Sequence, residues 1–183
     1  MNASNKNHSW LAPLETWLAK QSSQVPLRFL APEATGSARS ELKDLLKKHP
    51  AIRGSFLEAL LWLRIGCMEP AHSLVQDSTE GLGAYIHGFL HRMEGDYWNA
   101  NYWFRRIRDP KLLQDIAENL TNQGLFAADL TDACEQASNA KNSLVKNPPE
   151  NQSVENQSLG NQSLGNQITN EWLAMFKIAL AST

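Results

Sequence analysis

The chain has few of the features that identify common classes of protein. Its 183 residues include only two cysteines, Cys67 and Cys134, which lie far apart and fit no metal-ligand spacing. This favours two buried thiols in a reducing compartment over a disulfide framework. No apolar run approaches the roughly eighteen residues of a membrane-spanning helix, and the polar N-terminus lacks the apolar segment of a secretory signal. We therefore expect a cytoplasmic protein that does not enter a membrane.

The chain also lacks an excess of positive charge. It has 17 basic and 19 acidic residues, a net charge of -2, and residues 80–110 are balanced in the same way. A surface that neutralises phosphates normally needs a basic stripe, so nucleic acid is not an expected partner. Phosphate-cradling glycine loops and Gly-x-Ser-x-Gly elbows are missing as well, so no motif predicts a cofactor.

What the sequence does have is apolar residues at helical spacing. Residues 78–94 show this most clearly, with an apolar stripe formed by Leu82, Ile86, Phe89, Leu90 and Met93. No segment alternates polar and apolar residues as a strand would. Connections between the segments are short, which favours antiparallel helix pairs. The sequence predicts an all-α fold, with a domain of about seven to eight helices over residues 9–137.

The two ends of the chain differ from this central part. Residues 1–8 are polar and are expected to be disordered. Residues 138–170 are rich in Asn, Gln and Ser and contain a repeated unit, Asn-Gln-Ser-Leu-Gly. The copies are too few to bury the core of a β-helix, so a low-complexity linker is predicted. Residues 171–183 carry Trp172, Leu173 and Phe176 at helical spacing, and we expect this helix to pack back on the domain because an exposed stripe of this kind is a liability.

The densest chemistry lies in residues 87–106. His87 and His91, four residues apart, have the spacing that lets two imidazoles share one metal ion. Glu94 lies seven residues from His87, about 10 Å along a helix, which is too far for a common coordination shell. A third ligand would have to come from elsewhere, with His72, Asp96 and Asn99 as candidates. The alternative is that both histidines are half-buried and hydrogen-bonded to neighbouring helices.

Glu94 and Asp96 flank a predicted turn at Gly95. Asp96 is expected to cap the helix that starts at Tyr97, and Glu94 to pair with Arg92 or with the arginines at 105 and 106. A desolvated carboxylate here could instead act as a general base. The candidate catalytic residues are therefore His91 and Glu94.

On the following helix, Asn99, Trp103 and Arg106 share one face. An aromatic ring between an amide and a guanidinium suits a planar, anionic or peptide-like ligand. The opposite face, with Ala100 and Phe104, is expected to be core. The full set of predicted ligand contacts is His87, His91, Arg92, Glu94, Asn99, Trp103 and Arg106.

Two resemblances concern this region. Gly95-Asp96-Tyr97-x-x-Ala100-x-x-x-Phe104 resembles the second half of a tetratricopeptide repeat, although no second copy follows about 34 residues away, so the resemblance implies one helical hairpin. The string from His91 to Arg106, with Ala71-His72 upstream and Glu171-Trp172-Leu173 near the end, resembles a family of small, uncharacterised all-helical proteins of bacteria, fungi and plants. This resemblance covers roughly residues 55–137 and 170–180, and it implies a shared domain and site without supplying a reaction.

Three functions are compatible with these patterns. The first is recognition of a peptide, a small anionic molecule or a partner protein by a polar and aromatic helical surface. The second is an enzyme, with a divalent metal on His87 and His91, with His72 as a third candidate ligand, and with Glu94 in the reaction. The third is a structural module in which the polar residues only fix the helix pairing.

Overall fold

The structure is a computed structural model that describes residues 9–24, 36–119, 127–146 and 155–183. Within these ranges all regular structure is helical, so the all-α prediction is confirmed. None of the described helices combines the length and apolar character needed to cross a bilayer. The elements in chain order are α1 (Leu11–Gln24), α2 (Gly36–Lys48), the 3-10 helix η1 (Pro50–Ile52), α3 (Phe56–Arg64), α4 (Met68–Val75), α5 (Gly81–Glu94), α6 (Tyr97–Arg106), α7 (Pro110–Asn119), α8 (Ala127–Lys146) and α9 (Glu155–Ala181).

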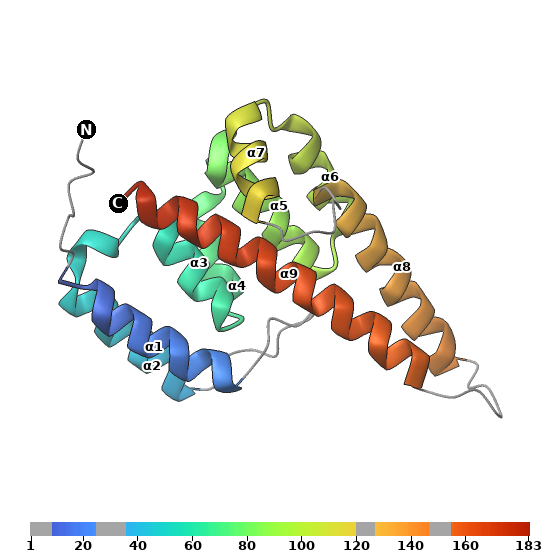
Figure 1. The fold of residues 1–183 in the computed structure, drawn as a ribbon, viewed down its shortest axis with the longest axis horizontal. Coiled ribbons are helices and arrows are strands. Elements are labelled where there is room, and N and C mark those ends of the chain that lie inside the picture. Colours follow the sequence, from blue (N-terminus) through green and yellow to red (C-terminus); the bar gives the residue numbers. More distant parts are fainter. Residues whose placement is uncertain (1–8, 25–35, 120–126, 147–154) are drawn as a thin grey trace.

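The long helix α9 organises the rest of the molecule. It runs across the molecule and contacts α3, α5, α7 and α8, while α1 and α2 pair at one side (Figure 1). Consecutive helices from α3 to α6 pack on one another, as short connections require. Residues 171–183, where the sequence predicts a docking helix, form the last turns of α9 and the chain end.

Helices α8 and α9 differ from the predicted linker. The structure has helix over 138–146 and 155–170, whereas the sequence predicts a linker throughout 138–170. The reason is visible in α9, where Leu164, Ile168 and Trp172 are all buried at four-residue spacing. They extend the apolar stripe of the docking helix into the repeat, whose five-residue period hides the helical one. Residues 1–8, predicted to be disordered, and 147–154 lie outside the described residues.

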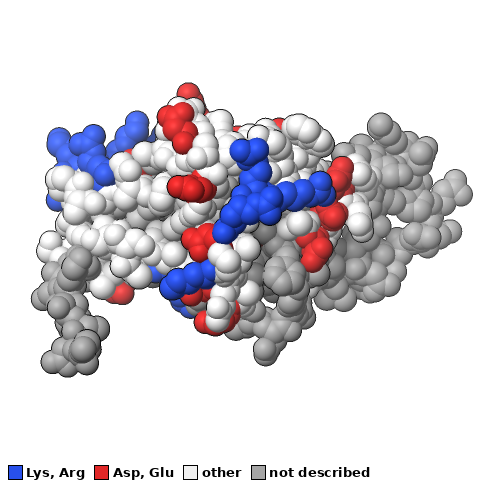
Figure 2. All heavy atoms as spheres, turned by 90° about the horizontal axis from the view of Figure 1, so that it is seen from above, with Lys and Arg blue, Asp and Glu red and all other residues white. Residues whose placement is uncertain are grey.

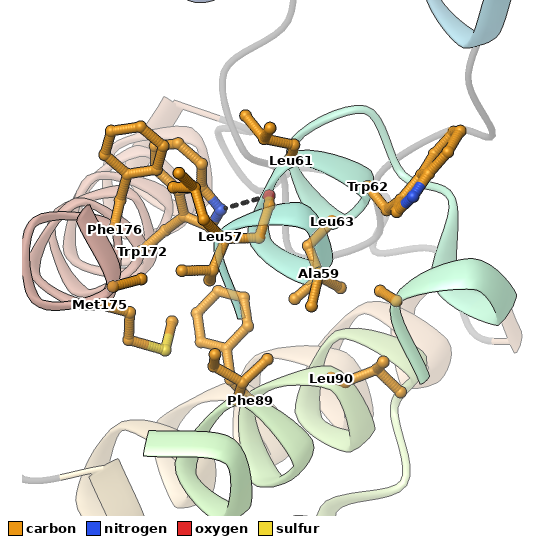
Figure 3. Packing of buried hydrophobic residues seen from close by; sticks show 14 of the residues in the cluster. Leu57, Ala59, Leu61, Trp62, Leu63, Phe89, Leu90, Trp172, Met175 and Phe176 are labelled. Carbon is orange, nitrogen blue, oxygen red and sulfur yellow. Dashed lines mark hydrogen bonds between the residues drawn. The ribbon is translucent and has the colours of Figure 1, made fainter. Parts of the chain in front are cut away.

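The core lies between α3, α5 and α9. Figure 3 shows Trp172, Met175 and Phe176 of α9 beside the leucines of α3, with Phe89 of α5 close to them. The indole N–H of Trp172 donates a hydrogen bond to the carbonyl of Leu60 at 3.0 Å, which satisfies the polar end of a buried ring. Burial of these side chains supplies the main free energy that holds α9 in place.

A buried polar network adds to this apolar contact. Arg92 of α5 and Glu171 of α9 are 1% and 0% exposed and form an ion pair. The hydroxyl of Tyr85 donates to Glu171 Oε1 at 2.7 Å, and Arg92 Nη1 donates to Thr131 Oγ1 at 3.4 Å. The network joins α5, α8 and α9. Arg92 is thus an interior structural residue, contrary to its predicted place among the ligand contacts, because a carboxylate distant in sequence neutralises its charge.

The α5–α6 hairpin has the geometry that its sequence predicts. Gly95 adopts a left-handed conformation (φ 83°), which ends α5 and is easily reached only by glycine. Asp96 then caps α6, its Oδ1 accepting the N–H of Asn99 at 3.2 Å. At Gly88 a Cβ would lie 2.9 Å from the ring of Phe104, so the absence of a side chain lets α6 approach α5 closely. The hairpin brings His87 of α5 and Trp103 of α6 into contact.

Candidate metal centre

Three histidines meet where α4 packs on α5. His72 lies on α4, and His87 and His91 lie one turn apart on α5. The Nε2 atoms of His72 and His87 are 2.9 Å apart and share a hydrogen bond, and one ring nitrogen from each histidine lies within 4.8 Å of the others. Of the three candidates for a further ligand, the structure brings His72 into the cluster.

The packing of α4 against α5 sets the positions of these rings. Residues 76–80 turn the chain so that α4 lies against α5, and the buried side chains of Ala71 and Val75 fix the face that α4 presents. On α5, residues four apart stand one above the other, so the rings of His87 and His91 stack with centroids 4.8 Å apart. His72 is half-buried, whereas His87 and His91 are buried.

The spacing of the nitrogens is close to that of a coordination shell. A tetrahedral zinc ion with Zn–N bonds of 2.0–2.1 Å holds its ligand atoms about 3.3 Å apart. The His72–His87 separation is slightly shorter, and the widest separation in the cluster is longer. The separations therefore lie on either side of the tetrahedral value.

The electrostatics keep one ligand in its metal-binding form. Burial lowers the pKa of His87 to about 4, with the neighbouring charges of His91 and His72 adding to the effect and Glu94 opposing it. His87 is therefore neutral at pH 7, and protons compete weakly for it. The Nδ1 atoms of His87 and His91 are buried and make no hydrogen bond. Unsatisfied buried nitrogens of this kind are uncommon, and neither ring is fully hydrogen-bonded within the described residues.

Two carboxylates stand beside His91. Its Nδ1 lies 3.5 Å from Glu94 Oε2 and 3.9 Å from Asp96 Oδ2, and both carboxylates are exposed to solvent. A carboxylate beside a metal site can accept the proton of a metal-bound water molecule. The sequence predicts that Glu94 pairs with an arginine, whereas in the structure its carboxylate contacts the ring of His91.

The remaining predicted contacts separate into different roles. Trp103 is half-buried and stacks on His87 with ring centroids 4.2 Å apart, so it covers one side of the cluster. The side-chain amide of Asn99 donates to Asp96 Oδ2 at 3.3 Å and belongs to the α6 cap. Arg106 is exposed, with its guanidinium 5.0 Å from the ring centre of Tyr102. The site that the structure assembles is thus His72, His87, His91, Glu94, Asp96 and Trp103.

Sequence reasoning missed two kinds of residue. The sequence shows Glu171 only as part of a family resemblance. Its pairing with Arg92 could not be predicted, because the two residues are 79 positions apart. Trp98 and Tyr102 were not singled out, although an exposed pair of rings one turn apart on α6 is a detectable signal.

The chain was compared with protein-family models, with curated proteins and with solved structures, and no match was found. The two resemblances in the sequence therefore stay predictions.

Proposed function

We propose that the protein binds one divalent transition-metal ion through His72, His87 and His91 and uses it to activate a water molecule. The observation that carries the proposal is the convergence of three imidazoles from two helices, with nitrogens within 4.8 Å of one another. Two histidines on one helix could arise from a hydrogen-bonded core. The third histidine, His72, comes from a separate helix and lies close to both of them, which favours a set of metal ligands.

The chemistry of the donors favours zinc. Imidazole nitrogens suit zinc, copper, nickel and iron, whereas magnesium and calcium prefer oxygen ligands. Neither cysteine belongs to the cluster. Burial raises the pKa of Cys134 to about 12, so this residue stays a neutral thiol at pH 7. The ion would therefore bind to three nitrogens without a thiolate.

A three-histidine set is typical of a catalytic rather than a structural site. Structural zinc sites have four protein ligands, and catalytic sites have three and an open position for water or substrate. An ion in such a position lowers the pKa of its water and supplies a nucleophile at neutral pH. Glu94, which is exposed and lies next to His91, would be the proton acceptor for such a water molecule. This proposal gives His91 the role of ligand and Glu94 the role of base.

Equilibrium dialysis against zinc, followed by metal analysis of the purified full chain, tests the ligand set. The wild-type chain should retain one zinc ion per molecule. His87→Ala should weaken binding by more than about a hundredfold, because even neighbours of a ligand cost 10–100-fold when removed. The matched control is His49→Ala, which removes a histidine outside the cluster and should bind zinc as the wild type does. Equal retention by His87→Ala would contradict the proposal.

A second variant separates metal binding from water activation. Glu94→Gln should keep its zinc but hydrolyse p-nitrophenyl acetate at least about a hundredfold more slowly than the zinc-loaded wild type, which is the usual effect of losing a general base. If the zinc-loaded wild type shows no hydrolysis above free zinc, water activation is wrong even where the ligand set is right.

A further inference from the structure

A stripe of exposed aromatic side chains lies on the outer side of α6. Trp98 and Tyr102 are 79% and 43% exposed, the highest values among the large hydrophobic residues that the structure describes. Their rings stack with centroids 6.2 Å apart, and the guanidinium of Arg106 lies 5.0 Å from the centre of the Tyr102 ring. We call the residues Trp98, Tyr102 and Arg106 the α6 face. They are one turn apart along the helix and form a continuous surface.

Three basic side chains lie at and just beyond the end of this face. Arg105, Arg106 and Arg108 are exposed, and no ion pair joins any of them to a carboxylate of the described residues. Figure 2 looks onto the side of the molecule where α5, α6 and α7 lie uppermost in Figure 1, and it shows basic side chains gathered near the middle with acidic ones around them.

The neighbouring carboxylates already have other partners. Asp109 Oδ1 accepts the N–H of Leu112 at 3.0 Å and caps α7. Asp132 accepts a hydrogen bond from Asn101 at 3.0 Å, and Asp96 caps α6. The arginines at the end of α6 form no ion pair with a carboxylate of the described residues, so a carboxylate from outside the molecule can pair with them.

The opposite side of α6 packs against the rest of the molecule. Ala100 and Phe104 on its inner side are buried, and the ring of Trp103 meets Tyr102 edge-on at 5.6 Å. A partner would thus bind a preformed surface and would have little backbone to order. Trp, Tyr and Arg are the residue types that contribute most to binding energy at protein interfaces.

We infer that the α6 face binds an acidic peptide segment of a partner protein. Carboxylates of the peptide pair with the guanidiniums at 105, 106 and 108, and an apolar or aromatic side chain packs on Trp98. A nucleic acid fits less well, because acidic side chains surround the basic ones on this side of the molecule, whereas a phosphate backbone needs an extended basic stripe. The inference does not depend on the metal.

Fluorescence anisotropy of a fluorescein-labelled random copolymer of glutamate and tyrosine, titrated with the full chain, tests this inference. The copolymer should bind, and binding should weaken with added salt. Trp98→Ala and Arg106→Glu should each weaken it by at least about tenfold, as expected for central interface residues. Leu173→Ala, an exposed apolar residue on α9, and Arg53→Glu, an exposed arginine outside α6, are the matched controls and should bind as the wild type does.

The outcomes are distinguishable. Absence of copolymer binding, or equal weakening by the control variants, would overturn the inference. Tighter binding of a single-stranded oligo-dT than of the copolymer would overturn it in favour of nucleic acid. His87→Ala, which disables the proposed metal centre, should bind the copolymer normally, so failure of one proposal leaves the other testable.

Discussion

Replacing Glu171 with alanine should lower the free energy of unfolding by about 3–5 kcal/mol, as measured by urea denaturation of the full chain. The change leaves the guanidinium of Arg92 buried without its countercharge, and it removes the acceptor of the Tyr85 hydroxyl. The guanidinium would lose its countercharge and the hydroxyl its acceptor while both stay buried, which costs far more than losing a pair in water. The expected effect is one of the largest that a single substitution can have in this chain.

Two controls identify the cause. Glu41→Ala breaks the exposed ion pair with Lys20 and should cost less than about 1 kcal/mol. The double variant Arg92→Met/Glu171→Leu removes both buried charges and should recover the part of the lost stability that comes from the uncompensated charge, although the Tyr85 hydroxyl still lacks its acceptor. If Glu171→Ala costs no more than Glu41→Ala, the Arg92–Glu171 pair does not hold α9 on α5 as described.

Zinc should stabilise the wild-type chain against unfolding by about 2.7 kcal/mol when its free concentration is a hundredfold above the dissociation constant. The ion would join His72 on α4 to His87 and His91 on α5, an arrangement that exists only in the folded chain. His72→Ala removes the one ligand from α4, so at the same zinc concentration most of this gain should be lost.

Thermal denaturation with and without zinc measures this difference, and His49→Ala, outside the cluster, should respond as the wild type does. An equal zinc-induced rise in the Tm of His72→Ala would show that the ion does not connect the two helices.

The sequence was sufficient for the fold class and for local features. Apolar residues at helical spacing predict the helices, and Gly95 and Asp96 predict the turn between α5 and α6 with its cap, all of which depend on neighbours within one turn. The linker prediction for 138–170 failed for a related reason. The polar composition of this segment gives no sign that any of its residues would be buried. Leu164 and Ile168 are buried because α9 packs on helices that are distant in sequence.

The candidate site could be predicted only in part. His87 and His91 share a helix face by their spacing, but the choice of His72 over Asp96 or Asn99 depends on how α4 packs on α5. The interior position of Arg92 depends in the same way on a residue of α9, 79 positions away. Local periodicity therefore predicts which residues share one face of a helix, whereas tertiary packing determines which residues of other helices they contact.

X-ray absorption spectroscopy at the zinc edge of the zinc-loaded full chain tests the central claim most directly. The account predicts a shell with three imidazole nitrogens at about 2.0–2.1 Å and one further light atom. Loss of imidazole scattering in His87→Ala, with no loss in His49→Ala, would place the ion at the cluster. A shell of six oxygens, or a sulfur ligand at about 2.3 Å, would contradict the three-histidine centre.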